Sequence, residues 1–229
     1  SSGGSAINEF LEIIQSARDA GQDVTTEMYP YEASHSDIAS ALFDDWENWE
    51  DDQFQHNMWL ATGERLTRES FARYRKIGGR MITFSRTEEQ TRDALRHPLT
   101  MIASDGRILD GKGHPRSSGT YAKVLGQYVR EEQLLDLMDA LRRMTIEPAR
   151  RLESFVPAMR NKGRVRVGAD ADITIFDPET VLDRSTYTDP LRPSQGIEYV
   201  LVNGAVVLDE RVLYPEIRAG IAIRSNKAF

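Results

Sequence analysis

The chain has 229 residues, 40% of them hydrophobic and 28% charged, a composition typical of a globular protein with one large domain or two small ones. A formal net charge of −7 argues against a nucleic-acid partner. No apolar run approaches the ~20 residues of a membrane span, so no membrane partner is expected. The absence of cysteine excludes disulfides and thiolate metal sites and is compatible with the cytoplasm, where we place the protein.

The first 105 residues predict an alternation of helices and strands. Three predicted helices each precede a predicted strand, in the pairs 6–20 and 23–29, 68–79 and 80–85, and 87–96 and 99–105. Thr87 and Gln90 have the spacing of a capping box. This order is typical of parallel βα units in a doubly wound sheet or a (β/α)8 barrel. Residues 32–66, with the acidic and aromatic run FDDWENWEDD, predict an insertion or lid with a solvated acidic face.

The character of the chain changes near residue 160. Residues 122–154 have helical patterns, whereas GRVRVGADADITIFD and IEYVLVNGAVVLDERVL predict strands, with a hairpin at Asn203-Gly204. We therefore expect two parts, residues 1–160 and residues 161–229. Three parallel strands cannot close a barrel of eight, and the chain begins with serine, so we expect a piece of a longer protein.

The strongest candidate for catalysis is Asp105, directly after the predicted strand TMIA. At the carboxyl end of a parallel strand, a carboxylate could bind a divalent metal or transfer a proton, although an ordinary Asp-Gly turn fits equally well. Arg116 could hold a substrate carboxylate or form a surface ion pair. Tyr29, Tyr31 and Ser36 could line the same face or serve only in packing and turns. His35 follows the end of the predicted strand at YPY, where a loop could carry function. None of the four histidines is spaced to share a metal with another.

Several motifs together carry a resemblance. EMYPYEAS, HPLTMIASDG, GHPRSSGTYAKVLGQYVRE, LMDALRRMTIEPARRL, KGRVRVGADADITIFDP and YVLVNGAVVLD occur in this order. The chain thereby closely resembles the C-terminal half of the N-acyl-D-amino-acid deacylases (D-aminoacylases), in the metal-dependent amidohydrolase superfamily. The resemblance implies an α/β fold, namely strands 6 to 8 of the (β/α)8 barrel and part of a small accessory β-sandwich. It also implies hydrolysis of the linear amide of an N-acyl D-amino acid.

The resemblance further implies roles for single residues. Asp105 matches the aspartate beside the metal centre, which acts as general base and acid and is the one metal-site residue present. Arg116 and Tyr29 match residues that hold the substrate α-carboxylate. The family's hydroxyl residue aligns with His35, with Ser36 next to it, and this departure bears on side-chain specificity.

The remaining ligands of zinc or another divalent metal would precede this chain. We therefore expect no tight metal binding and no activity from the chain alone, which would need the N-terminal barrel half in cis or in trans. Two alternatives stay open. The complete protein could hydrolyse cyclic amides, like a dihydroorotase or hydantoinase, or the chain could be a non-catalytic binding or scaffold piece.

Overall fold

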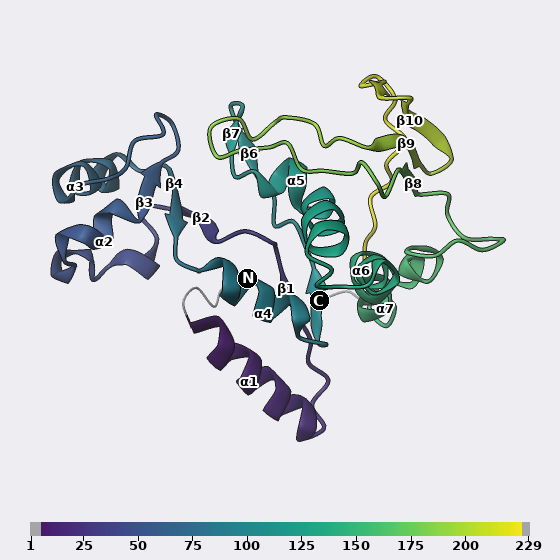
Figure 1. The fold of residues 1–229 in the computed structure, drawn as a ribbon, viewed down its shortest axis with the longest axis horizontal. Coiled ribbons are helices and arrows are strands. Elements are labelled where there is room, and N and C mark those ends of the chain that lie inside the picture. Colours follow the sequence, from purple (N-terminus) through teal and green to yellow (C-terminus); the bar gives the residue numbers. More distant parts are fainter. Residues whose placement is uncertain (1–5, 226–229) are drawn as a thin grey trace.

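The structure, a computed structural model, describes residues 6–225 (Figure 1). At its centre two parallel strands pair, β1 (Thr26–Met28) and β5 (Thr100–Ile102). Helices α1 (Ile7–Asp19) and α4 (Glu88–Arg96) pack beside each other and bury apolar side chains against this pair. The capping box predicted at Thr87 is present at the start of α4.

One predicted parallel strand is wrong. Residues 80–85 contain β4 (Arg80–Phe84), which pairs antiparallel with β2 (Ala33–Asp37) and β3 (Asn57–Trp59) in the order β2-β4-β3. The expected parallel set therefore has two strands, not three, in the described residues. A helix followed by a short apolar run looks the same in sequence whichever partner the strand takes. Long-range pairing with the insertion decided its direction.

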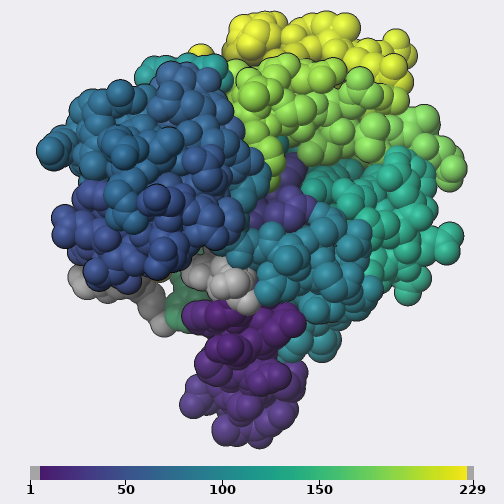
Figure 2. Space-filling view, turned by 60° about the vertical axis from the view of Figure 1, so that its left-hand side comes forward, coloured from purple at the N-terminus to yellow at the C-terminus, as the bar shows by residue number. Residues whose placement is uncertain are grey.

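The predicted insertion, residues 32–66, forms a lobe together with residues 67–84, which the sequence assigned to the next helix–strand unit. This lobe contains the three-stranded sheet and is seen in blue in Figure 2. It also holds α2 (Asp51–Gln55), α3 (Arg68–Ile77) and two short 3-10 helices, Ala41–Phe43 and Trp46–Asn48. Its aromatic side chains turn inward and pack on one another, while most of the acidic ones are exposed. The core comprises Ile38, Phe43, Trp46, Trp49, Phe54, Trp59, Leu66, Phe71, Tyr74 and Met81.

Helices form the next layer. A small hairpin, β6 (Ile108–Leu109) and β7 (Lys112–Gly113), leads into α5 (Arg116–Lys123), which continues as the π-helical segment η4 (Val124–Glu131). Then follow α6 (Leu137–Met144), α7 (Ile146–Leu152) and the 3-10 helix Pro157–Asn161.

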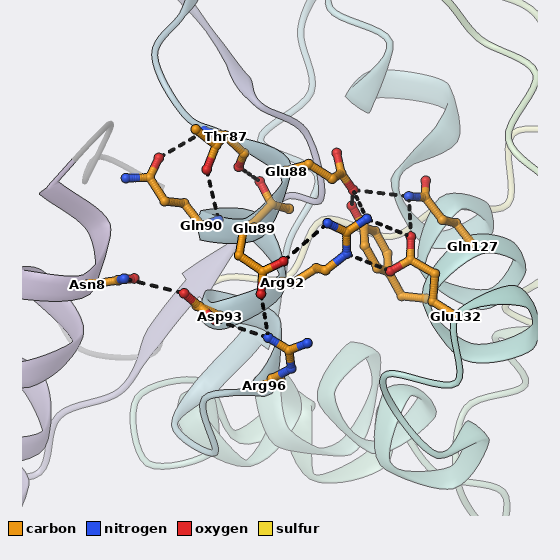
Figure 3. Close-up of polar contacts among 12 residues, drawn as sticks. Asn8, Thr87, Glu88, Glu89, Gln90, Arg92, Asp93, Arg96, Gln127 and Glu132 are labelled. Atoms are coloured by element: carbon orange, nitrogen blue, oxygen red, sulfur yellow. Dashed lines mark hydrogen bonds and ion pairs between the residues drawn. The ribbon is translucent and has the colours of Figure 1, made fainter.

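Polar side chains join α4 to the end of η4 (Figure 3). Tyr128 Oη donates to Glu88 Oε1 at 2.6 Å, and Gln127 Nε2 donates to both Glu88 and Glu132. Arg92 forms an ion pair with Glu132, 2.8 Å from Nε to Oε2. These contacts fix the helix that carries Arg116 against the helix before β5.

The C-terminal part contains one antiparallel sheet in the order β11-β10-β9-β8. Its strands are β8 (Ile173–Phe176), β9 (Ile197–Val202), β10 (Ala205–Asp209) and β11 (Val212–Leu213). The predicted hairpin is confirmed: Asn203 and Gly204 both have positive φ, 50° and 83°, as a type I′ turn requires. Residues 163–172, predicted as strand, form none. The sheet packs on α5 and η4 through a cluster that includes Val181 and Leu125. No helix in residues 6–225 is long and apolar enough to cross a bilayer.

Candidate functional site

Asp105 and Arg116 form an ion pair at the carboxyl end of β5. Arg116 Nη2 lies 2.8 Å from Asp105 Oδ2. The Asp105 side chain is 56% exposed, whereas that of Arg116 is only 4% exposed. Asp105 has φ +46°, a left-handed conformation that Asp tolerates better than most residues. At Gly106 a Cβ atom would lie 2.8 Å from the Cα of Ser117, so this loop lies directly on the start of α5. The close approach brings Asp105 to Arg116.

Tyr29 lies beneath the guanidinium of Arg116. It follows β1, is 2% exposed, and its ring centroid is 4.2 Å from Arg116 Cζ. The cation therefore stacks on the aromatic face, which holds the guanidinium plane in place. Tyr29, Asp105 and Arg116, three of the predicted site residues, thus come together from β1, β5 and α5.

His35 lies on β2 opposite Ile82. Burial, together with the nearby charges of Arg116, Arg80 and Arg107, lowers the pKa of His35 to about 4, so the ring is neutral at pH 7. Its Nε2 is buried and has no hydrogen-bond partner among the described residues. Successive side chains of a strand point to opposite faces, so Ser36 points away from the face that His35 shares with Arg116. The substrate-binding roles of His35 and Ser36 stay predictions.

His114, which precedes Arg116 in the HPR motif, is a buried residue to which the sequence analysis assigned no role. It is 0% exposed; its Nδ1 accepts from the backbone N–H of Arg116, and its Nε2 is 2.9 Å from the Ala33 carbonyl oxygen. Because Nδ1 is an acceptor, Nε2 carries the proton and donates to that carbonyl. Burial and the charge of Arg116 lower the pKa of His114 to about 2. His114 is thus a neutral support for the first residue of α5.

The residues present do not form a metal site by themselves. The described part of the chain contains no group of three or more His, Cys, Asp or Glu side chains placed to hold one ion. Both ring nitrogens of His114 are already hydrogen-bonded. Asp105 is left as a single carboxylate directed at Arg116, which is too few ligands for a catalytic zinc.

Further polar groups surround the candidate site. Tyr31 Oη donates to Asp183 Oδ2 at 2.7 Å, and Asp183 also accepts from Ser185. Arg86 is 8% exposed, and its Cζ lies 4.8 Å from the ring centroid of Tyr29. The two tyrosines of YPY indicated this segment, but no sequence pattern pointed to Arg86 or Asp183.

Comparison with known proteins shows the family of the chain. Residues 6–208 match the sequence profile of the Amidohydrolase family. The chain belongs to the amidohydrolase family. The resemblance predicted from the motifs is confirmed by two kinds of relative, curated sequences and solved structures.

Among curated relatives, this amidohydrolase chain is 35% identical to an N-acyl-D-glutamate deacylase of Alcaligenes xylosoxydans xylosoxydans, over 94% of its own length and 44% of the relative. It is 42% identical to an N-acyl-D-aspartate deacylase of the same organism over 49% of the chain and 22% of the relative. The chain thus spans less than half the length of these proteins.

Two solved structures are similar to this amidohydrolase chain. A crystal structure of D-aminoacylase aligns with a TM-score of 0.76 at 28% identity, covering 97% of this chain and 47% of the other. The N-acyl-D-glutamate deacylase of Bordetella bronchiseptica, complexed with zinc and a phosphonate inhibitor, aligns with a TM-score of 0.74 at 32% identity, covering 93% and 44%.

Proposed function

We propose that this chain supplies part of the active site of an N-acyl-D-amino-acid deacylase. In the complete protein, water attacks the acyl carbonyl of a linear amide and releases a carboxylic acid and a free D-amino acid. The observation that carries the proposal is the exposed carboxylate of Asp105 paired with the buried guanidinium of Arg116 over Tyr29. Relatives named N-acyl-D-glutamate deacylase and D-aminoacylase support the reaction class.

The roles we propose follow from exposure and charge. Asp105 is the exposed partner, so it takes a proton from the attacking water and gives it to the leaving nitrogen. Arg116 and Tyr29 hold the α-carboxylate of the substrate, a planar anion that matches the forked guanidinium. His35 lies close enough for its pKa to respond to both Asp105 and Arg116 and presents a neutral ring beside them.

We further propose how the chain fits the complete protein. β1 and β5 belong to the (β/α)8 barrel, supported by their parallel pairing, and the β8–β11 sheet is part of the accessory sandwich. The division near residue 160 remains part of this proposal. Asp105 is the one metal ligand from this chain, and the others come from the N-terminal barrel half, in cis or in trans. A relative solved with zinc supports zinc or another divalent ion there. Without that half the chain is inactive, and the cytoplasm remains the proposed location.

The proposal is tested by substrate comparison with the complete protein. We expect release of free amino acid from N-acetyl-D-amino acids and at least a hundredfold slower release from the L enantiomers, about 2.7 kcal/mol in the transition state. Dihydroorotate and hydantoins should be inert. Ring opening of these cyclic amides without turnover of the linear D substrates would favour the cyclic-amide alternative. Failure to hydrolyse either class by a metal-loaded protein would favour a non-catalytic piece.

A further inference from the structure

Arg86, directly beyond β4, is a buried cation without a carboxylate partner in the described residues. It is 8% exposed. Its Nη2 donates to the carbonyl oxygen of Tyr31, while its Nη1 is buried and has no hydrogen-bond partner among residues 6–225. No described Asp or Glu oxygen lies within 4.0 Å of its nitrogens. The guanidinium is therefore only partly satisfied.

The surroundings of Arg86 are unfavourable for an unpaired cation. Burial lowers the pKa of Arg86, and so does the charge of Arg116. An arginine nevertheless stays protonated in proteins, and a buried charge without a counterion is strongly destabilising. An anion that arrives with a ligand would remove this cost.

Arg86 lies at the edge of a cavity that lacks negative charge. The cavity has a volume of about 580 Å³ between the insertion lobe and the start of α4, and Arg86 lines it beside His56 and Asn57. Aromatic side chains, Phe43, Trp49 and Phe84, form much of the rest of its wall. No Asp or Glu lines it, although the chain as a whole carries a net charge of −7. The cavity suits an apolar chain that ends in an anion.

Arg86 also lies near the group proposed to hold the α-carboxylate. The Cζ atoms of Arg86 and Arg116 are 4.8 and 4.2 Å from the same Tyr29 ring centroid. The two guanidinium carbons are therefore no more than 9.0 Å apart. A dicarboxylic amino acid can place one carboxylate on each guanidinium across such a span. Each carboxylate can then form a bidentate pair with its guanidinium.

Resting on the proposed function, we infer that Arg86 binds the side-chain carboxylate of the substrate and makes the enzyme selective for N-acyl derivatives of D-aspartate or D-glutamate. Arg116 then binds the α-carboxylate, and Arg86, at the edge of the cavity, binds the second one. Arg86 is thus a specificity-determining residue, and the Tyr31 carbonyl fixes its orientation.

The first test uses the complete enzyme and matched substrates. N-acetyl-D-glutamate and N-acetyl-D-glutamine have nearly the same shape. They differ in the charge of the side-chain group that we propose Arg86 binds. We expect kcat/KM to be roughly tenfold to a hundredfold higher for the acid, as the loss of a hydrogen bond to a charged group implies. Equal or better turnover of the glutamine derivative would overturn the inference and leave the proposed function intact. No turnover of any N-acetyl-D-amino acid would contradict the proposed function itself.

The second test separates binding from a structural role. Arg86→Gln should lower kcat/KM for the acid by a similar factor through KM, and leave the value for the amide nearly unchanged. Arg86→Lys keeps the charge and should retain part of the preference if Arg86→Gln does not fold. Arg73→Gln is the matched control, because Arg73 stacks on Tyr74 at 4.6 Å in the same lobe but outside the cavity. Arg73→Gln should leave kcat/KM unchanged for both substrates. An equal loss for both substrates in folded Arg86→Gln would mean that Arg86 only positions Tyr31.

Discussion

Replacing Tyr31 by phenylalanine tests how much the hydrogen bond between Tyr31 and Asp183 stabilises the protein. Tyr31 is 4% exposed, and its hydroxyl donates to Asp183 Oδ2 at 2.7 Å across 152 positions of sequence. Burial and the charge of Asp183 raise the pKa of the Tyr31 hydroxyl, so it keeps its proton and remains a donor at any working pH. The substitution removes the hydroxyl and leaves the ring packing unchanged.

The magnitude follows from the charge of the acceptor. A hydrogen bond to a charged group contributes about 1.5–3 kcal/mol, so the substitution should lower the free energy of unfolding by about that amount. For a protein of this size, such a loss lowers Tm by roughly 3–12 °C. Asp183 keeps its two contacts with Ser185, so the lower half of that range is expected.

Thermal and urea unfolding of the purified protein measure the effect, and Tyr187→Phe is the matched control. The Tyr187 hydroxyl is buried but has no partner among the described residues, so its removal should be neutral or stabilising. A double-mutant cycle of Tyr31→Phe with Asp183→Asn should give a coupling energy of about 1 kcal/mol or more. Equal Tm changes for the two tyrosine variants would refute the reasoning.

Three further predictions concern the site and its supports. Arg116→Gln in the complete protein should raise KM for N-acetyl-D-amino acids at least tenfold, measured by steady-state kinetics, and an unchanged KM would place the α-carboxylate elsewhere. Gly119→Ala should lower Tm although alanine favours helices, because the new Cβ would lie 1.9 Å from Asp183 Oδ1; a higher Tm would contradict the packing. The free energy of unfolding should fall as the pH drops below 6.5. The pKa values of His35 and His114 are lowered to about 4 and about 2 in the folded state, so these rings become protonated on unfolding but stay neutral in the folded protein. At pH 5 each accounts for about 2 kcal/mol, so His35→Gln should flatten the urea-midpoint profile between pH 6.5 and 4, and an unchanged slope would count against its burial.

The sequence predicted local structure better than strand pairing. The capping box at Thr87 and the Asn203-Gly204 turn are set by neighbours in the chain, and both are present as predicted. The direction of β4 was wrong because it depends on partners tens of residues away in the insertion lobe. Val165 and Val167 alternate like strand residues but pair with no strand and are exposed.

The candidate site was predictable only where its residues lie next to strand ends in recognisable motifs. Tyr29, Asp105 and Arg116 were found this way, and the structure brings them together. No sequence motif identifies Arg86. We propose a role for it because its buried guanidinium has no counterion among the described residues, which only the structure reveals. Asp183 became visible only through its contact with Tyr31, far away in the chain.

The most direct test of the account is the activity of Asp105→Asn in the complete protein. Asparagine can still accept a hydrogen bond from Arg116, so the variant removes the basicity of the carboxylate and keeps the local contact. With N-acetyl-D-glutamate as substrate, we predict that kcat falls by roughly 10²–10⁴, the usual contribution of a positioned acid or base. The Tm should also fall, because the buried Arg116 loses its counterion. A kcat within threefold of the parent protein would contradict proton transfer by Asp105 and the function proposed around it.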